Sequence, residues 1–303
     1  MFKTLRFVLA LLMGALALPL LSESLAGAAS APRCIVSLSP TATETLFAIG
    51  AGPQVQAVDS DSDYPTTGLP TKRINAFNPS VEAILGICKS SASHPSTKPD
   101  LVVISYDANS IEQKLTSQGV KVIDQDAATS VANALSQIRQ LGALTGHVTK
   151  ADALATSLNA TITADIKSVP THPDKKITVY YETGTNPYYS LTSQTFVGSL
   201  MKSLGLVNIA DADSTTADAG YPELSAEYII SANPKLILLA GTASPARVAK
   251  RPGFAKVSAV VNHNVVELNA DISSRWGPRL GLLMNQLTAV VKATLKNATL
   301  WKK

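Results

Sequence analysis

Short apolar runs alternate with amphipathic stretches along most of this chain. Runs of the length of a buried strand lie at 34–38, 55–58, 101–105, 120–123, 178–181, 236–239 and 265–268. Most of the intervals between them repeat apolar residues at the three- and four-residue spacing of an amphipathic helix. Alternation of strands and helices predicts an α/β fold with mainly parallel sheets covered by helices.

One helical pattern near the middle of the chain is unusually long. Apolar positions recur on one helix face at Val148, Ala151, Leu154, Ala155, Leu158, Ile162 and Ile166. The pattern predicts a continuous helix over 148–169 that stops near Pro170. About 20 helical residues span about 30 Å, which is long enough to join two separate lobes.

An internal repeat favours two lobes over one. The segment Pro79-Ser-Val-Glu82 followed by Pro99 and a strand resembles Pro222-Glu-Leu-Ser-Ala-Glu227 followed by Pro234 and a strand. We therefore predict two Rossmann-like lobes, at 32–147 and 175–300, joined by the single helix, with a ligand cleft between them. A single doubly wound domain is the alternative interpretation. The first copy also carries a Ser-rich insertion that contains Cys88 and His94.

The first 28 residues have the pattern of a secretory signal. Lys3 and Arg6 precede an apolar run from Phe7 to Leu21, and small residues including Ala26-Gly27-Ala28 follow. The run is shorter than the roughly 20 residues of a membrane span. We expect an exported protein, soluble after cleavage and located in the periplasm or outside the cell.

Export changes the interpretation of the two cysteines, Cys34 and Cys88. An even number of cysteines in an oxidising compartment favours a disulfide. The alternatives are a thiol site or two separate buried cysteines. The spacing excludes a CxxC redox motif.

Charge and motifs argue against nucleic-acid binding and against common enzyme classes. The net charge of +4 is spread along the chain without a basic run. The chain has no GxSxG, HExxH or GxxxxGK[ST] motif, and its four histidines are scattered. We expect no catalytic site, no resident cofactor and no metal. Asp59, Asp61 and Asp63 resemble the start of a calcium loop, but Tyr64-Pro65 follows where that loop needs glycine, so a solvated turn is favoured.

Aromatic residues gather in predicted loops instead of strand centres. They lie beside Pro, Gly or Asn and mostly follow a strand or precede a helix, at Tyr64, Phe77, Tyr106, Tyr189, Tyr221 and Trp276. In parallel sheets such loops meet at the carboxyl ends of the strands, where ligands bind. Aromatic side chains projecting from two lobes would suit a large, flat or ring-rich ligand. Some of them are equally expected to cap their own lobe's core.

The loop 271–279 brings one carboxylate and two guanidinium groups together before the last predicted helix. Asp271, Arg275 and Arg279 could pair with one another and hold the loop in shape. Either kind of group could instead meet a ligand amide or carboxylate. Both interpretations stay open from the sequence.

An ordered set of these motifs resembles the cobalamin and iron-siderophore class of substrate-binding proteins, which serve ABC importers. The motifs are Ile35-Val-Ser-Leu-Ser-Pro40 with Thr43-Glu44, Asp63-Tyr64-Pro65, Glu82-Ala-Ile, Lys98-Pro-Asp-Leu-Val, Tyr221-Pro with Ser225-Ala-Glu227, and Ser274-Arg275-Trp-Gly-Pro-Arg279. The agreement covers about residues 32–297 and is greatest with the cobalamin-binding members. The family fold has two lobes joined by one long helix.

The resemblance implies roles for individual residues. Aromatic side chains grip the corrin ring in that class, which would place Tyr64, Tyr106, Tyr189 and Tyr221 at the ligand. It would also place Asp271 and Arg275 near the ligand. Glu82 and Glu227 match two glutamates, one on each lobe, that dock onto arginines of the permease. The partners are thus a small ligand and the permease subunits, and we expect a monomer.

The ligand is less closely defined than the class. The cobalamin-binding pattern has tryptophans where this chain has Tyr106, Tyr221 and the Ala76-Phe77 region. It also lacks the insertion that contains Cys88. Haem or a ferric siderophore is the alternative ligand. An exported α/β hydrolase is a third possibility, for which Ser39, His263 and Asp271 could be proposed, although their spacing gives it no support. Cys34 and Cys88 would lie at the edge opposite the cleft, where a disulfide would cross-link the insertion to the start of the first strand.

Overall fold

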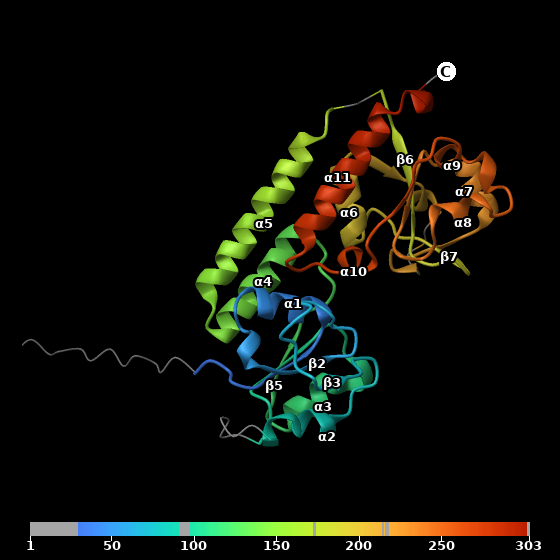
Figure 1. The fold of residues 1–303 in the computed structure, drawn as a ribbon. Coiled ribbons are helices and arrows are strands. Elements are labelled where there is room, and N and C mark those ends of the chain that lie inside the picture. The colour runs from blue at the N-terminus through green and yellow to red at the C-terminus, as the bar shows by residue number, and fades with distance from the viewer. Residues whose placement is uncertain (1–29, 91–96, 172–173, 214, 216–217, 302–303) are drawn as a thin grey trace, which may run out of the picture. The chain divides into compact units, whose positions relative to one another are not determined.

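The computed structural model describes residues 30–90, 97–171, 174–213, 215 and 218–301. The expected signal segment, residues 1–28, lies outside the described residues, as does His94. Residues Ala31–Lys303 form one compact unit, which contains all the helices and strands given below (Figure 1).

The first sheet has five parallel strands in the order β3-β2-β1-β4-β5. Its strands are β1 Ile35–Leu38, β2 Val55–Asp59, β3 Arg73–Ile74, β4 Leu101–Ile104 and β5 Lys121–Asp124. The helices of this lobe are α1 Pro40–Ala48, α2 Val81–Leu85, α3 Ile111–Ser117 and α4 Val131–Thr145, with 3₁₀ turns at Gly52–Gln54, Ile87–Ser90 and Ala108–Ser110. β1 and β4 are buried at every position, as their continuous apolar runs predict.

The second sheet has four parallel strands in the order β11-β10-β6-β8. They are β6 Ile177–Glu182, β8 Leu206–Asn208, β10 Leu236–Leu239 and β11 Val265–Glu267. A separate antiparallel pair joins β7 Tyr188–Tyr189 to β9 Glu223–Leu224. The helices are α6 Phe196–Ser203, α7 Ala226–Ala232, α8 Pro245–Ala249, α9 Ser258–Val261, α10 Ala270–Ser273 and α11 Leu280–Lys296, with 3₁₀ turns at Ile209–Ala212, Phe254–Lys256 and Ala298–Trp301.

The long helix is α5, Val148–Ser168, one residue shorter than predicted. It packs beside α4 and α11 (Figure 1). Its apolar face lies first against the core of the first sheet, through Ala151, Ala155 and Leu158. Further along, Ile162 enters the core of the second sheet. A single apolar face shared by two cores explains why the three- and four-residue spacing persists along the whole helix.

The structure therefore has two α/β lobes with mainly parallel sheets, as predicted. Helix α4 also contributes to both cores, since Ala134 packs with the second sheet while Leu135 and Ile138 pack with the first. The Gly50–Pro53 segment is a helix end and turn, with Gly50 at a φ of +90°. Strands β3, β7, β8 and β9 have only two or three residues and had no sequence signal.

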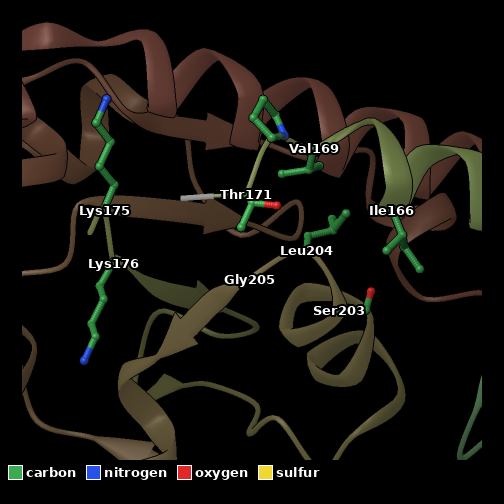
Figure 2. A pocket seen from close by; sticks show the side chains of 9 residues that line it. Ile166, Val169, Thr171, Lys175, Lys176, Ser203, Leu204 and Gly205 are labelled. Carbon is green, nitrogen blue, oxygen red and sulfur yellow. The ribbon is translucent and has the colours of Figure 1, made fainter. Parts of the chain in front are cut away.

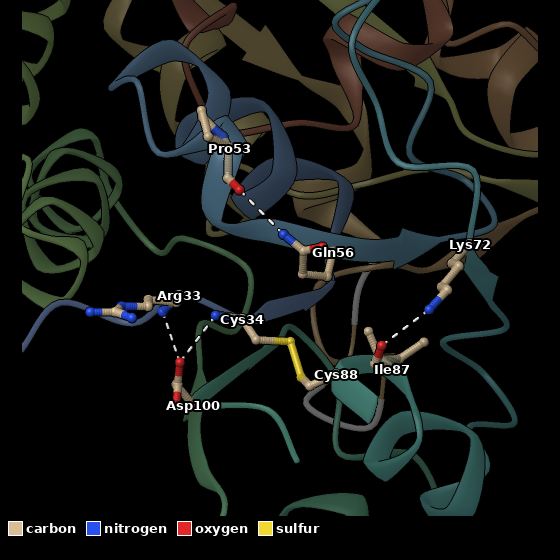
Figure 3. The surroundings of a disulfide bond; sticks show 8 residues. All are labelled: Arg33, Cys34, Pro53, Gln56, Lys72, Ile87, Cys88 and Asp100. Atoms are coloured by element: carbon tan, nitrogen blue, oxygen red, sulfur yellow. Dashed lines mark hydrogen bonds between the residues drawn. A yellow bond between two sulfur atoms is a disulfide. The ribbon is translucent and has the colours of Figure 1, made fainter. Parts of the chain in front are cut away.

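Cys34 and Cys88 form the predicted disulfide, with a Cα–Cα distance of 6.3 Å (Figure 3). Both cysteines are fully buried. The Asp100 carboxylate accepts hydrogen bonds from the backbone N–H groups of Arg33 and Cys34, at 2.7 and 3.0 Å. Cys34 precedes β1, so the disulfide lies at the amino edge of the sheet, opposite the edge formed by the carboxyl ends of the strands.

Candidate functional site

The second sheet has a topological switch point between β6 and β10. The chain continues from β6 to β8 on one side and places β10 on the other. In open parallel sheets, ligands bind beside the carboxyl ends of the strands at such a point. Tyr181 and Thr183 at the end of β6, and Ala240 after β10, line a pocket of about 330 Å³ there.

This pocket also takes residues from the first lobe. Ala127 and Ala128 lie between β5 and α4 and form part of its wall. The remaining wall is mostly apolar and aromatic, with Leu191, Phe196, Val197, Tyr221, Ala270, Ser273, Ser274, Arg275 and Trp276. We call this the interlobe pocket, because both lobes supply its lining.

A second pocket of about 500 Å³ shares Ala127, Ala128, Phe196 and Tyr221 with the first. Its other lining is rich in hydroxyl and amide groups, from Thr129, Thr192, Gln194, Thr195 and Thr215, and is completed by Ala219 and Gly220. We call it the hydroxyl pocket. An apolar compartment beside a hydroxyl-lined one suits a ligand with a large ring system and polar substituents.

Three of the predicted ligand residues meet in the interlobe pocket: Tyr221, Arg275 and Trp276. Tyr221 is about half exposed, and it is shared with the hydroxyl pocket. Asp271 does not line either pocket, but its carboxylate pairs with the Arg275 guanidinium at 3.9 Å. The predicted pairing within the loop 271–279 is therefore present, although it is not the main contact of that loop.

The main contacts of this loop reach the first lobe. Arg279 donates two hydrogen bonds to the Glu44 carboxylate, at 2.9 and 2.5 Å, across 235 positions of sequence. Arg275 lies 3.7 Å from the same carboxylate, and its Nε atom is buried without a hydrogen-bond partner. The hydrogen bond to Glu44 raises the pKa of Arg279 against the opposing effect of burial. Arg279 is thus held by the Glu44 carboxylate, whereas the terminal nitrogens of Arg275 donate to the Ser274 hydroxyl at 2.8 Å and to the Asp61 backbone carbonyl at 3.4 Å.

Trp276 makes a further contact between the lobes. Its indole Nε1–H donates to the Gln137 side-chain oxygen on α4 at 2.8 Å. Its ring packs against the core of the second sheet. Trp276 therefore both lines the pocket and caps a core, two roles that the sequence had offered as alternatives.

The predicted aromatic residues of the first lobe lie along the carboxyl edge of its sheet. Tyr64 follows β2, Phe77 follows β3 and Tyr106 follows β4, and all three are exposed. None of them lines the two pockets. Tyr64 has one ring face against the Arg279 guanidinium, whose carbon lies 4.4 Å from the ring centre.

The loops that carry Phe77 and Tyr106 are tied together. The Asn109 side-chain amide donates to the Asn78 side-chain oxygen at 3.2 Å. Asn109 and the next residue, Ser110, both have a φ of 56°, a left-handed conformation that is strained for residues other than glycine.

Tyr189 lies on β7 and pairs with Glu223 of β9. Glu223 is two positions after Tyr221 in the sequence. The Tyr189 ring is partly exposed, and it does not line either pocket. The neighbouring Tyr188 instead packs against Phe254 in the core of the second lobe, with ring centres 5.8 Å apart. The two adjacent tyrosines therefore face different environments, as the alternation of a strand requires.

Tyrosines and carboxylates define the electrostatics around the pockets. Burial raises the pKa of Tyr181 to about 12 and also raises the pKa of Tyr221. At the end of β5, burial and the nearby carboxylates of Asp126, Glu112 and Asp107 raise the pKa of Asp124 to about 6. The pocket tyrosines therefore stay neutral, and the adjacent rim of the first lobe is negatively charged.

Glu82 and Glu227 occupy equivalent positions in the two lobes. Each lies two residues after a serine N-cap, Ser80 for α2 and Ser225 for α7, and each is exposed. A hydrogen bond to its own backbone N–H and one from Ser80 lower the pKa of Glu82. The internal repeat therefore corresponds to a structural repeat, with one acidic group on each lobe.

Other groups considered from the sequence lie elsewhere or have a structural partner. His263 precedes β11 while Asp271 follows it, so these two residues lie at opposite edges of the sheet. Ser39 is buried and accepts a hydrogen bond from the N–H of Ala42 as the N-cap of α1. The expected solvated turn is wrong for Asp59, which is buried as the last residue of β2, and burial raises its pKa even though it accepts hydrogen bonds from Ser62 and Asp61. No group of three or more possible metal ligands occurs among the described residues.

A pocket of about 360 Å³ lies away from the cleft, before β6 and beside the end of α5 (Figure 2). Lys175 and Lys176 line it, and their side chains extend in opposite directions (Figure 2). It contains none of the residues predicted to bind the ligand. Within the part of the chain that the structure describes, no helix is long and apolar enough to cross a membrane.

No role was predicted from the sequence for Glu44, Gln137 or the Ala127–Ala128 wall, although Glu44 belongs to one of the family motifs. Glu44 had one signal, since it is the only charged residue from Cys34 to Val58. A charge in so long an uncharged stretch indicates a buried group with a specific partner. Gln137 and the two alanines had no signal, because their contacts come from distant parts of the chain.

Comparison with known proteins agrees with the fold. Residues 35–272 match the periplasmic binding protein family. An uncharacterised ABC transporter substrate-binding lipoprotein of Bacillus subtilis is 30% identical over 258 residues, covering 82% of this chain and 76% of that protein. A cobalamin-binding protein of Halobacterium salinarum is 29% identical over 262 residues, covering 83% of this chain and 67% of that protein.

Among solved structures, the periplasmic vitamin B12-binding protein of Vibrio cholerae is similar with a TM-score of 0.71 and 25% identity, covering 88% of this chain and 98% of the other. Periplasmic haem-binding proteins share the fold at less than 25% identity. The chain therefore belongs to the periplasmic binding protein family, as a non-enzymatic substrate-binding protein of the class that works with ABC transporters.

Proposed function

We propose that this protein is exported, binds cobalamin or a related corrinoid between its lobes and delivers it to an ABC permease. The observation that carries the proposal is the pair of adjoining pockets at the switch point of the second sheet. The aromatic interlobe pocket suits the edge of a corrin ring. The hydroxyl pocket suits the amide groups around such a ring, since threonine hydroxyls both donate and accept hydrogen bonds.

The exposed aromatic side chains extend this surface. Tyr64 and Tyr106 lie at the carboxyl edge of the first sheet, and Tyr189 and Tyr221 belong to the second lobe. Rings presented by both lobes can cover a large, flat ligand at low cost in side-chain entropy, because each ring has few rotatable bonds. Phe77, Asp271 and Arg275 are proposed to contribute at the margin of the same ligand.

Charge favours a corrinoid over haem or a ferric siderophore. A tyrosine that binds iron must lose its proton, and burial raises the pKa of both Tyr181 and Tyr221. Haem and many ferric siderophores also carry negative charge. Arg275 is the one cationic side chain lining the two pockets in the described part of the chain, and it already lies between Glu44 and Asp271. The negative rim around Asp124 adds repulsion against anions.

Titration calorimetry of the purified protein tests the ligand. Cobalamin, haem and a ferric hydroxamate are titrated in parallel, and we expect tight, equimolar binding of cobalamin alone. As a matched pair of variants, Tyr221→Ala should weaken binding, whereas Tyr228→Ala removes a tyrosine that lies outside both pockets. Heat with an iron compound and none with cobalamin would reject the corrinoid and retain the transport class.

Glu82 and Glu227 are proposed to dock onto arginines of the permease, one glutamate on each lobe. Two exposed carboxylates at equivalent helix starts can pair with arginines and fix the register of docking. Replacing both by alanine should abolish cobalamin uptake by cells and leave binding unchanged. Glu112→Ala is the control, since it removes an acidic residue from the first turn of another helix, α3. Full uptake by the double variant would reject this docking role.

A further inference from the structure

The described residues include two buried bidentate arginine–glutamate pairs, one within a lobe and one between lobes. Arg251 and Glu182 belong to the second lobe, where Arg251 donates to both carboxylate oxygens at 2.5 and 2.9 Å. Arg279 and Glu44 form the same arrangement at 2.5 and 2.9 Å. The arginine side chains are similarly buried, at 12% and 13% exposure. The two pairs differ in what they join.

Glu44 belongs to α1, which packs on the first sheet, and Arg279 directly precedes α11, which packs on the second. The pair therefore fixes the distance between the lobes at this point. Gly277 adds a close approach, because a Cβ atom there would lie 3.2 Å from the Thr41 side chain. A fork of two charge-assisted hydrogen bonds specifies geometry more narrowly than a single contact does.

Arg279 also supports Tyr64. Its guanidinium lies against one face of the ring, and the tyrosine is otherwise 41% exposed. Because Glu44 holds the guanidinium plane, it also holds the plane on which the ring rests. Neither Glu44 nor Arg279 lines the interlobe pocket or the hydroxyl pocket.

We propose that Glu44 and Arg279 are positioning residues, which orient Tyr64 toward the ligand and keep the lobes at their binding distance. Arg275 lines the interlobe pocket, while its buried Nε atom lies 3.7 Å from the same Glu44 carboxylate. Both arginines of this loop therefore face Glu44, and Arg275 also reaches the pocket. The inference about binding rests on the proposed function, but the orientation of Tyr64 and the lobe distance can be measured without any ligand.

The test compares Arg279→Lys with Arg251→Lys. Lysine keeps the charge in both cases and loses the planar fork, so the two variants remove the same chemistry from pairs of similar burial. Arg251 also lies against a tyrosine ring, that of Tyr188, with its guanidinium carbon 5.0 Å from the ring centre. A difference between the two variants therefore arises from where the pair lies, between the lobes or within one lobe, and not from the chemistry of the pair.

Three measurements are made on each protein. Fluorine NMR of 3-fluorotyrosine incorporated at position 64 reports the surroundings of that ring. Spin labels on Gln113→Cys in α3 and Ser231→Cys in α7 report the distance between the lobes. Stopped-flow release of cobalamin reports the lifetime of the complex.

For Arg279→Lys we expect a shifted and broadened fluorine resonance, a wider distribution of lobe distances and cobalamin release about tenfold faster, which corresponds to about 1.4 kcal/mol. Arg251→Lys should leave all three readouts as in the unaltered protein, even where it lowers the melting temperature. Glu44→Gln should reproduce the effects of Arg279→Lys.

An unchanged fluorine resonance and an unchanged distance distribution in Arg279→Lys would overturn the proposal, whatever its melting temperature. The same changes in Arg251→Lys as in Arg279→Lys would also overturn it. If the unaltered protein binds no cobalamin, the proposed function fails, and the fluorine and distance readouts still decide the positioning role.

Discussion

Removal of the Cys34–Cys88 disulfide should destabilise the protein strongly without weakening ligand binding. The bond joins positions 54 residues apart, so it restricts a long loop of the unfolded chain. In the chain-entropy treatment, closing a loop of this length stabilises the folded state by about 4 kcal/mol. Both cysteines are fully buried among apolar side chains, including Ile84 and Leu115.

That burial decides the substitution to use. Cys34→Ala with Cys88→Ala removes the link and leaves small apolar side chains in the core. Serine at the same two positions would add hydroxyl groups that need hydrogen-bond partners, at about 1–3 kcal/mol for each unsatisfied group. The alanine variant therefore measures the loop restriction, and the serine variant should lose more stability than the alanine variant.

Guanidinium unfolding followed by circular dichroism gives the free energy of unfolding of each protein. We expect a loss of about 3–4 kcal/mol for the alanine variant, with a melting temperature lower by about 10 °C. Treatment of the unaltered protein with a reductant should produce a similar loss. Calorimetry with the ligand should give an unchanged affinity, because the disulfide lies at the sheet edge opposite the candidate site.

Two results would refute this reasoning. A loss below about 1 kcal/mol would mean that the loop is already restricted in the unfolded chain. A large loss of ligand affinity in a variant that remains folded would mean that the disulfide shapes the cleft, contrary to its position before β1.

Asp124→Asn should stabilise the protein at pH 7, because the pKa of Asp124 is raised to about 6. A raised carboxyl pKa means that stability from this group is present near pH 4 and is lost as pH rises through 6. After discounting for solvent screening, we expect Asp124→Asn to raise the free energy of unfolding at pH 7 by about 0.5–1 kcal/mol. Thermal melts from pH 4 to 8 should show this gain in stability shrinking toward low pH. Gly198→Ala should lower the free energy of unfolding by about 3 kcal/mol, since its Cβ would collide with the Thr192 backbone carbonyl. Chemical unfolding measures this loss, and near-native stability would contradict the close packing of α6 at this position. Trp276→Phe should lose about 1 kcal/mol through its missing hydrogen bond to Gln137, and the Trp276→Phe, Gln137→Ala double variant should lose less than the sum of the single variants.

Much of the fold follows from the sequence because its signals are local. Short, mainly apolar runs predicted β1 and β10, whose side chains are buried on both faces of their sheets. The spacing along α5 marked a helix with one apolar face. The internal repeat marked the equivalent helix starts at Ser80 and Ser225. An even number of cysteines in a chain expected to be exported predicted the disulfide.

The candidate site was only partly predictable. The rule that loops after parallel strands carry ligand residues identified Tyr221 and Trp276, and the charged loop 271–279 identified Arg275. All three line one pocket. The same rule selected Tyr106 and Phe77, which lie at the correct edge but outside both pockets. A strand fixes the edge at which its loop emerges, whereas the path of the loop depends on the neighbours it meets.

The sequence by itself determined the alternation of strands and helices, the linking helix, the disulfide and the sheet edges that carry aromatic residues. Only the tertiary structure decided that Glu44 pairs with Arg279 across 235 positions, that Trp276 bonds to Gln137 across 139, and that two alanines close a pocket of the other lobe. The physical reason is the range over which each signal acts. Periodicity and turn chemistry act within a few residues, whereas pairing between lobes depends on how the two sheets are set against each other by the helices that pack on both.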